Sequence, residues 1–204
     1  FGDGMSTRNI AILTEEHRII EYVLNALERM ANKTATEHTV DVAIGRKVIT
    51  FLREFADQCH HGKEEAILFK WLNARHIGMD AVAMLEDEHV AGRDLVVRMQ
   101  RALDEFEKNK EIGSFADDAN TFIAMLRDHI HKEDHGVFAM ADGHIEAADD
   151  VRLIGDYLIT ERDGRRHQKA LALAQDIGHL MNMPGFDISI IPELSKTFIN
   201  SNHA

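Results

Sequence analysis

One pattern occurs twice in this chain, and the duplication limits the fold more than any other feature. The first copy runs from Cys59 to Phe69 and the second from Asp128 to Phe138. In both copies a histidine is followed four residues later by a glutamate, a lysine precedes that glutamate, and an apolar pair ends the pattern. A Glu-His pair also lies upstream of each copy, with its histidine 43 residues before the first copy's and 40 before the second's. The chain therefore divides into two similar halves, each with a single histidine and a His-x-x-x-Glu pair.

Apolar residues recur at helical spacing along four segments, which predicts four long amphipathic helices. The first 183 residues contain no proline that would interrupt a helix. Val, Ile and Thr do not form the alternating runs of strands. The first expected helix begins after a cap at Ser6 or Thr7, and the second runs from near Thr39 past Trp71. The third covers 82–106, and the fourth runs from a cap at Ser114 to about 141. A break is expected at 32–36. Together the segments predict an all-α, up-down-up-down four-helix bundle. In bundles of this kind, side chains on facing helices can bind metal ions in the core.

Six side chains with metal-binding chemistry fall on the apolar faces of these helices. They are His17, His60, Glu64, His89, His129 and Glu133. Residues four apart share a helix face, so each His–Glu pair can bind one ion, or its carboxylate can bridge two. Mixed imidazole and carboxylate ligands suit iron, manganese or zinc. Burying so many ionisable groups without a metal or close pairing would cost several kcal/mol each. The sequence therefore predicts a two-metal centre inside the bundle.

Two other pairs have the same spacing and are interpreted as more solvent-facing. They are His61 with Glu65 and His131 with His135. The helical line through His61 passes Glu54, which indicates a more polar face. Aligning the two halves by the apolar residues that follow each glutamate also favours the six ligands above. Whether Glu21, His61 or Glu86 adds a ligand stays open, and a solvated salt bridge is the preferred interpretation of the two glutamates.

Charge and cysteine content restrict the partners and the compartment. The net charge of −12 argues against nucleic acid and anionic membranes, which both reward clustered Lys and Arg. No apolar run approaches the roughly 20 residues that span a bilayer, and no signal peptide is visible. Cys59 is the only cysteine and is expected to fill space in the core rather than react. A reducing, cytoplasmic location is the simplest expectation.

The expected domain organisation has three parts. Residues 1–7 are a disordered start or a cloning remnant, 8–142 form the bundle, and 143–204 form a C-terminal helical extension and tail. Residues 145–183 are expected to be helical, with a division at Asp163-Gly164. The tail from Gly185 to Ile191 is apolar enough to pack on another surface. No motif occurs in this third of the chain, so a covering helix and a homodimer contact both stay open.

On these residues the chain resembles the hemerythrin family, specifically the bacterial hemerythrin-like group called the HHE cation-binding domain. The resemblance covers about residues 8–142. It implies a four-helix bundle with a non-haem di-iron site, that is, two Fe ions with an oxo or hydroxo bridge. It also implies that the six residues above are the ligands and that a position stays open for a small molecule. Oxygen-carrying hemerythrins have a second histidine four residues before the one matching His89, where this chain has Leu85.

The departure at Leu85 implies that one iron lacks an imidazole, which argues against reversible oxygen carriage. Gly92, about one turn after His89, contributes no side chain and is expected to leave room beside the metals. The leading expectation is therefore a di-iron protein that binds or senses O2, NO or H2O2. The second hypothesis is a di-iron enzyme that decomposes peroxide or reduces nitric oxide. Iron storage or supply is a third, disfavoured because storage sites are rich in carboxylates.

Overall fold

The computed structural model describes residues 6–161 and 165–185, and within these ranges every regular element is a helix. The all-α class is confirmed. In chain order the elements are α1 (Arg8–Glu37), α2 (Val42–Phe51), η1 (Leu52–His61), η2 (Glu64–Leu68), α3 (Phe69–Asn73), α4 (Met79–Asn109), α5 (Phe115–Lys132), η3 (Glu133–Val137), α6 (Phe138–Asp142), α7 (Ala147–Glu161) and α8 (Arg165–Leu180). The elements named η are π-helical.

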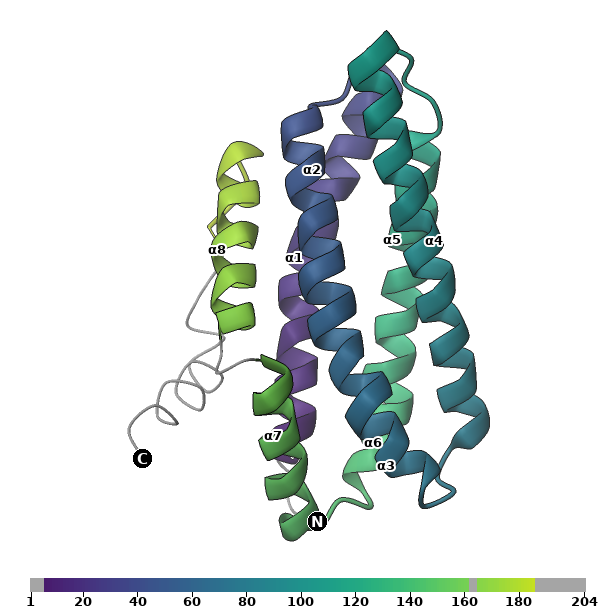
Figure 1. The fold of residues 1–204 in the computed structure, drawn as a ribbon, viewed down its shortest axis with the longest axis vertical. Coiled ribbons are helices and arrows are strands. Elements are labelled where there is room, and N and C mark those ends of the chain that lie inside the picture. The colour runs from purple at the N-terminus through teal and green to yellow at the C-terminus, as the bar shows by residue number, and fades with distance from the viewer. Residues whose placement is uncertain (1–5, 162–164, 186–204) are drawn as a thin grey trace.

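Four long helical segments lie side by side and are joined at alternating ends (Figure 1). They are α1, the continuous run from α2 to α3, α4, and the run from α5 to α6. Each packs against its neighbours, α1 against α5 and α2, and α4 against α5 and η1. The inward faces form one apolar core that includes fully buried residues of every segment, such as Leu13, Phe51, Leu103 and Phe115.

The helix ends follow local chemistry, with one difference from expectation. The Asp41 side chain accepts a hydrogen bond from the Ile44 N–H, which caps α2 close to its expected start. The break expected at 32–36 is wrong. Thr34 is buried there, and the helix continues until His38, whose left-handed φ of 53° ends it. Packing of this last turn outweighs its weak helix propensity.

Both copies of the repeated motif contain a π-helical turn. The N–H of Phe69 donates to the carbonyl of Glu64, and the N–H of Phe138 donates to that of Glu133, each across five residues. A π turn widens the helix and is typical of functional sites, because it changes the direction in which side chains point. In the first copy the π-helical stretch is longer, since it already begins at Leu52.

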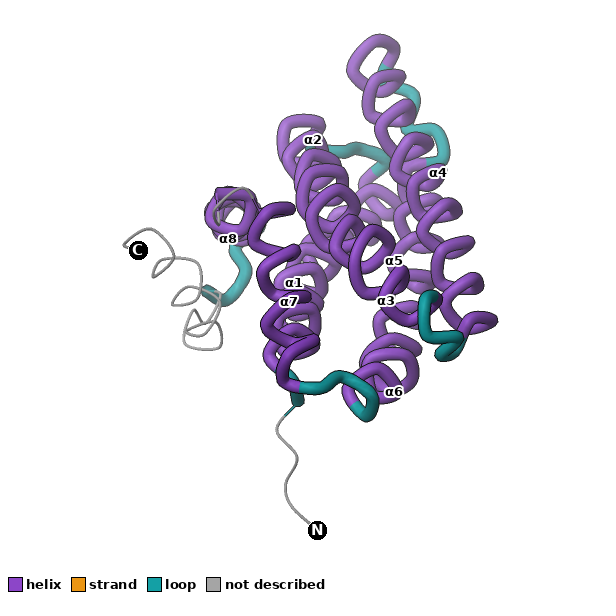
Figure 2. Tube along the Cα trace, turned by 60° about the horizontal axis from the view of Figure 1, so that its bottom comes forward, coloured by secondary structure: helices purple, strands orange, loops and turns teal. Residues whose placement is uncertain are grey.

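The C-terminal extension covers one side of the bundle. As expected, it forms two helices on either side of residues 162–164, which lie outside the described residues. Helix α7 packs on α1 and η2, while α8 packs on α1, α2 and η1 (Figures 1 and 2). Gly178 allows the close approach of α8, because a Cβ there would overlap the Tyr22 hydroxyl. The tail expected to pack after Gly185 lies outside the described residues.

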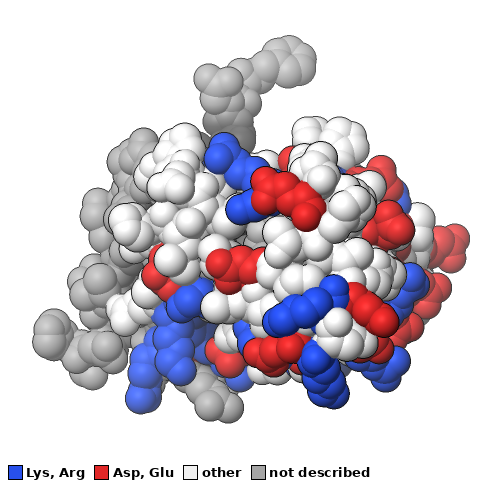
Figure 3. All heavy atoms as spheres, turned by 90° about the horizontal axis from the view of Figure 1, so that it is seen from above, with Lys and Arg blue, Asp and Glu red and all other residues white. Residues whose placement is uncertain are grey.

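The described surface is mixed in charge. On the face in Figure 3, Lys and Arg side chains lie among Asp and Glu side chains, so the described part of this face presents no continuous basic surface. Within residues 6–161 and 165–185, no helix is both long and apolar enough to cross a membrane.

Candidate metal centre

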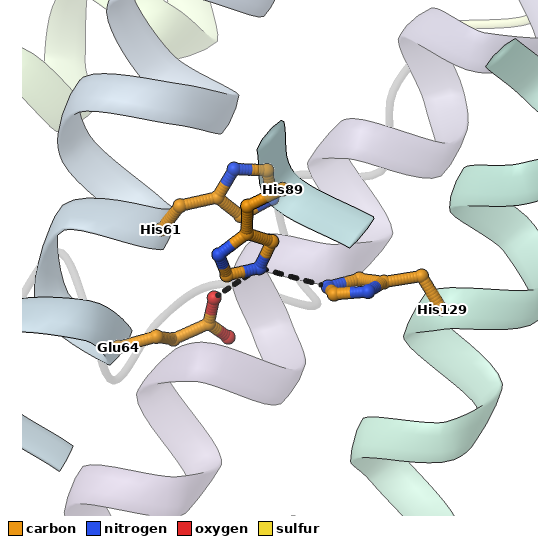
Figure 4. Close-up of side chains that lie close together, drawn as sticks. All are labelled: His61, Glu64, His89 and His129. Carbon is orange, nitrogen blue, oxygen red and sulfur yellow. Dashed lines mark hydrogen bonds and ion pairs between the residues drawn. The ribbon is translucent and has the colours of Figure 1, made fainter. Parts of the chain in front are cut away.

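Five histidines and two glutamates converge inside the bundle, and all seven are buried. They form two groups, and within each group the potential ligand atoms lie within 4.8 Å of one another. The first group is His61, Glu64, His89 and His129 (Figure 4), and the second group is His17, His60, Glu64 and Glu133. The structure thus brings together all six side chains that the sequence singled out, and it adds His61.

Each glutamate lies between histidines of the first group and histidines of the second group. One oxygen of each carboxylate faces a histidine of the first group, and the other oxygen faces a histidine of the second. The distances are 3.5 Å for His89 Nε2–Glu64 Oε2, 3.2 Å for His60 Nε2–Glu64 Oε1, 3.1 Å for His129 Nε2–Glu133 Oε1, and 3.2 Å for His17 Nε2–Glu133 Oε2. The two oxygens of each carboxylate therefore face different histidine groups.

Six of the polar atoms that face the centre lack ordinary hydrogen-bond partners. Among the described residues, Nε2 of His17 and of His60 is buried without one, and so are both oxygens of Glu64 and of Glu133. Leaving so many buried atoms unsatisfied is costly. Metal–nitrogen and metal–oxygen bonds of roughly 2.0–2.2 Å place two ligands of one ion about 3 Å apart. The observed spacing, including 3.0 Å between Nε2 of His89 and Nε2 of His129, fits such ligand pairs (Figure 4). The residues present therefore fit a pair of metal ions.

Carboxylates outside the centre hold four of the imidazoles in place. In each case Nδ1 donates to an acidic side chain, which leaves Nε2 pointing inward. The pairs are His17–Asp134 at 2.8 Å, His60–Glu16 at 2.9 Å, His89–Glu65 at 2.8 Å and His129–Glu88 at 2.9 Å. Such partners fix ring orientation and raise ligand basicity in metalloproteins. Each of these four acidic residues is the direct sequence neighbour of a ligand. Two of them precede His17 and His89, and the other two follow Glu64 and Glu133, so the repeated pattern already contains them.

The interpretation of His61 as solvent-facing is wrong. Its side chain is buried and stacks on His89 with ring centroids 3.8 Å apart. Successive side chains of an α-helix point about 100° apart, so only one of two neighbouring histidines would face inward. The π-helical stretch reduces this angle and brings His60 and His61 to the same side. The presence of Leu85 in place of a histidine led us to expect one imidazole fewer at the centre. His61 offers an additional imidazole there, from η1.

The remaining residues with ligand-like spacing lie outside the two ligand groups. His131 and His135 are both exposed, as the sequence predicted. Glu21 accepts a hydrogen bond from Arg127 at 2.8 Å, as a salt bridge near the surface. Glu86 belongs to neither group. The Glu65 side chain is 31% exposed, and it accepts hydrogen bonds from the imidazole of His89 and from Arg93.

The histidines differ in proton affinity. Burial lowers the pKa of His61 and of His89 from the ordinary 6.5 to about 4, so both rings are neutral at pH 7. Burial also opposes protonation of His17, but the neighbouring carboxylates of Asp134 and Glu133 outweigh it and raise the pKa to about 10. The pKa of His129 rises to about 9, because Glu133 again outweighs burial. Without metal, two of the imidazoles therefore hold protons that a metal ion must displace.

A fully buried lysine joins the C-terminal extension to the centre. Lys63 Nζ contacts the carboxylates of Glu16 and Glu161, and it lies 3.4 Å from Cys59 Sγ. Glu16 in turn holds the ligand His60. Glu16, Glu161 and His167 lie close enough to form a third group of potential ligands, but the lysine ammonium already provides the positive charge between the two carboxylates. This polar cluster therefore supports the centre instead of forming another metal site.

A cavity of about 370 Å³ adjoins the first group. His61, His89 and His129 line it, whereas His17 and His60 do not. Gly92 borders it, as the sequence led us to expect. On the opposite side, the ring of Phe138 stacks on His17 with centroids 5.4 Å apart and covers the second group. His17 and Asp134 also border a separate surface pocket between α1 and α5. The two groups therefore differ in their surroundings, since three histidines of the first group line the cavity and one histidine of the second group borders the surface pocket.

Comparison with known proteins identifies one family. Residues 8–141 match the family model described as the hemerythrin HHE cation-binding domain. No curated protein and no solved structure gives a significant match. The matched range contains all seven residues of the two ligand groups, and α7 and α8 lie outside it.

Proposed function

Because the chain belongs to the hemerythrin HHE cation-binding family, we propose that its two ligand groups bind two non-haem iron ions with an oxo or hydroxo bridge. The site then binds or senses O2, NO or peroxide. The observation that carries this proposal is the position of Glu64 and Glu133, each of which directs its two oxygens at histidines of different groups. A single ion would need only one of these orientations.

The surrounding residues have separate tasks in this proposal. The carboxylates on Nδ1 keep the imidazoles aimed at the ions, and the ring of Phe138 packs on His17 of the second group. A small ligand reaches the first group through the cavity beside His61 and His89. Bound iron supplies coordination positions and electrons for one-electron steps.

The cavity also favours a second candidate, a di-iron enzyme that decomposes peroxide or reduces nitric oxide. A site that only detects a diatomic molecule needs little space, whereas about 370 Å³ is open beside the ligands. Storage or supply of iron is disfavoured, because five imidazoles and only two carboxylates make up the ligand groups. Storage would favour a site with more carboxylates.

The proposed function is tested by metal analysis and optical spectroscopy of protein purified from iron-replete cells. We expect about two irons per chain and oxo-to-iron charge-transfer bands in the near ultraviolet. These bands should change when peroxide or nitric oxide is added. One tightly bound zinc ion and no iron after such growth would contradict the proposal.

A further inference from the structure

The cavity beside the first group is larger and more apolar than a diatomic ligand requires. We propose that it selects alkyl or aryl hydroperoxides, with the organic group among its apolar side chains and the peroxide end at His61, His89 and His129. This inference rests on the proposed di-iron function of the same site and specifies its substrate class.

The size of the cavity favours an organic substrate. A water molecule occupies about 30 Å³ of the liquid. O2, NO and H2O2 are of similar size, so each would fill only a small part of a cavity of about 370 Å³. Pockets of roughly 300–1,000 Å³ are typical of organic ligands. The volume is therefore suited to a substrate with a hydrocarbon group of several carbons.

The chemistry of the wall favours the same class. Three helical elements contribute apolar side chains, which are Leu52 and Ala56 from η1, Val96 from α4, and Phe122 and Leu126 from α5. Gly92 keeps space open between α4 and α5. A Cβ at this position would lie 3.2 Å from Met125 Cε and 3.6 Å from Phe122 Cε2. Such a wall stabilises a hydrocarbon group and gives hydrogen peroxide no comparable benefit.

The charges around the cavity argue for a neutral substrate. Arg93 donates to Asp57 at 2.7 Å and also bonds to Glu65, so its charge is compensated. Glu88 is compensated by Lys132. Arg53 lies in the solvent-exposed part of the lining. The imidazoles at the inner end are therefore the groups available to a polar peroxide end.

The reaction balances with the two ions alone. Reduction of a hydroperoxide ROOH breaks the O–O bond, consumes two electrons and two protons, and gives the alcohol ROH and water. If the two ligand groups held two ferrous ions, these would supply one electron each, and solvent would supply the two protons. A single turnover therefore needs no other reductant. Repeated turnover needs an external electron donor, and the test below therefore follows a single turnover of protein reduced beforehand with dithionite.

The test compares two substitutions on the same helix in the full-length, iron-loaded protein. Val96→Phe fills the cavity from α4, whereas Val90→Phe places the same ring at an exposed position outside the lining. Stopped-flow spectroscopy follows oxidation of the dithionite-reduced protein, after removal of excess dithionite, by cumene hydroperoxide or by hydrogen peroxide. We expect Val96→Phe to slow the cumene hydroperoxide reaction by about tenfold or more, the discrimination typical of apolar pockets. The hydrogen peroxide reaction should change less than about twofold, and Val90→Phe should change neither rate.

A binding measurement provides a readout that does not depend on turnover. Calorimetry with the product alcohol, 2-phenyl-2-propanol, should show binding to the unmodified protein and to Val90→Phe, and loss of binding in Val96→Phe. If Val96→Phe does not fold, Ala56→Leu fills the same cavity from η1 and should give the same pattern.

Equal slowing of both peroxides, unchanged rates in the filled variants, or no binding of the alcohol would each overturn the inference. A protein that holds no iron but binds the alcohol would overturn the di-iron function and the reduction step, and would leave the apolar ligand site standing. A protein with two irons that treats both peroxides alike would leave the di-iron function standing and remove the substrate class.

Discussion

Replacing Lys63 by Met should destabilise the fold strongly, because it removes the ammonium group that lies between two buried carboxylates. Lys63, Glu16 and Glu161 all have fully buried side chains. Burial opposes the charge on Lys63, but Glu16 and the neighbouring Cys59 and Glu161 outweigh it and raise the pKa of the ammonium group above its ordinary value. Met matches the lysine stem in size and is apolar, so the change removes the charge with little loss of packing.

The internal repeat supplies the matched control. Lys132 occupies the position of Lys63 in the second copy, and it contacts Glu88 and Asp128. Its side chain is 32% exposed, and that of Asp128 is 64% exposed. Removing one partner of a buried ion pair costs roughly 3–5 kcal/mol, since it leaves an uncompensated buried charge. Exposed pairs contribute only about 0–1 kcal/mol. We therefore expect Lys63→Met to cost several times more stability than Lys132→Met.

The measurement is urea unfolding of the metal-free proteins, followed by far-ultraviolet circular dichroism. The slope of free energy against urea shows whether the variants unfold to the same extent. Adding Glu161→Gln to Lys63→Met should restore part of the lost stability, because one of the two uncompensated carboxylates is then neutral. Equal losses for the two lysines, or no recovery in the double variant, would refute the reasoning from burial.

Three further predictions concern the centre and its surroundings. His61→Ala should reduce the iron content of the purified protein, whereas His135→Ala, at an exposed site on η3, should leave it unchanged. Equal iron content in the two variants would show that His61 is not a ligand. Iron uptake by the metal-free protein at pH 7 should release protons from His17 and His129, whose pKa values of about 10 and 9 keep them protonated there. Metal affinity should therefore rise with pH towards 9, as titration in weak buffer with an indicator can show. Cys59 should not react with a thiol reagent until the protein unfolds, because it is fully buried and burial raises its pKa.

Much of the centre follows from spacing alone. The duplicated pattern places His60 with Glu64 and His129 with Glu133 on inward faces, because residues four apart share a face in the helix. The role of His61 could not be predicted in this way. Whether a helix is widened to a π turn depends on its packing against neighbouring helices, and the apolar periodicity of one segment does not contain that information.

The partners from the extension were equally beyond the sequence. Glu161 lies about a hundred residues after Lys63 and outside the repeated pattern, so no local spacing relates the two. In contrast, Glu16 and Glu88 occupy equivalent positions beside ligands in the two halves. Each accepts a hydrogen bond from the histidine of the His-x-x-x-Glu pair in its own half. Repetition within the chain made the symmetric contacts predictable, and the unsymmetric ones required the tertiary structure.

The two similar halves depart from symmetry in what surrounds them. The repeat alone would give both lysines the same environment and both ligand groups the same access. Helices α7 and α8 cover α1, η1 and η2, where Glu161 completes the burial of Lys63. The equivalent Lys132 stays partly exposed, and the cavity opens between η1, α4 and α5 beside Gly92. Helices α7 and α8 thus cover the side of the centre that holds Lys63, and the cavity proposed for the ligand lies on the side that these two helices leave uncovered.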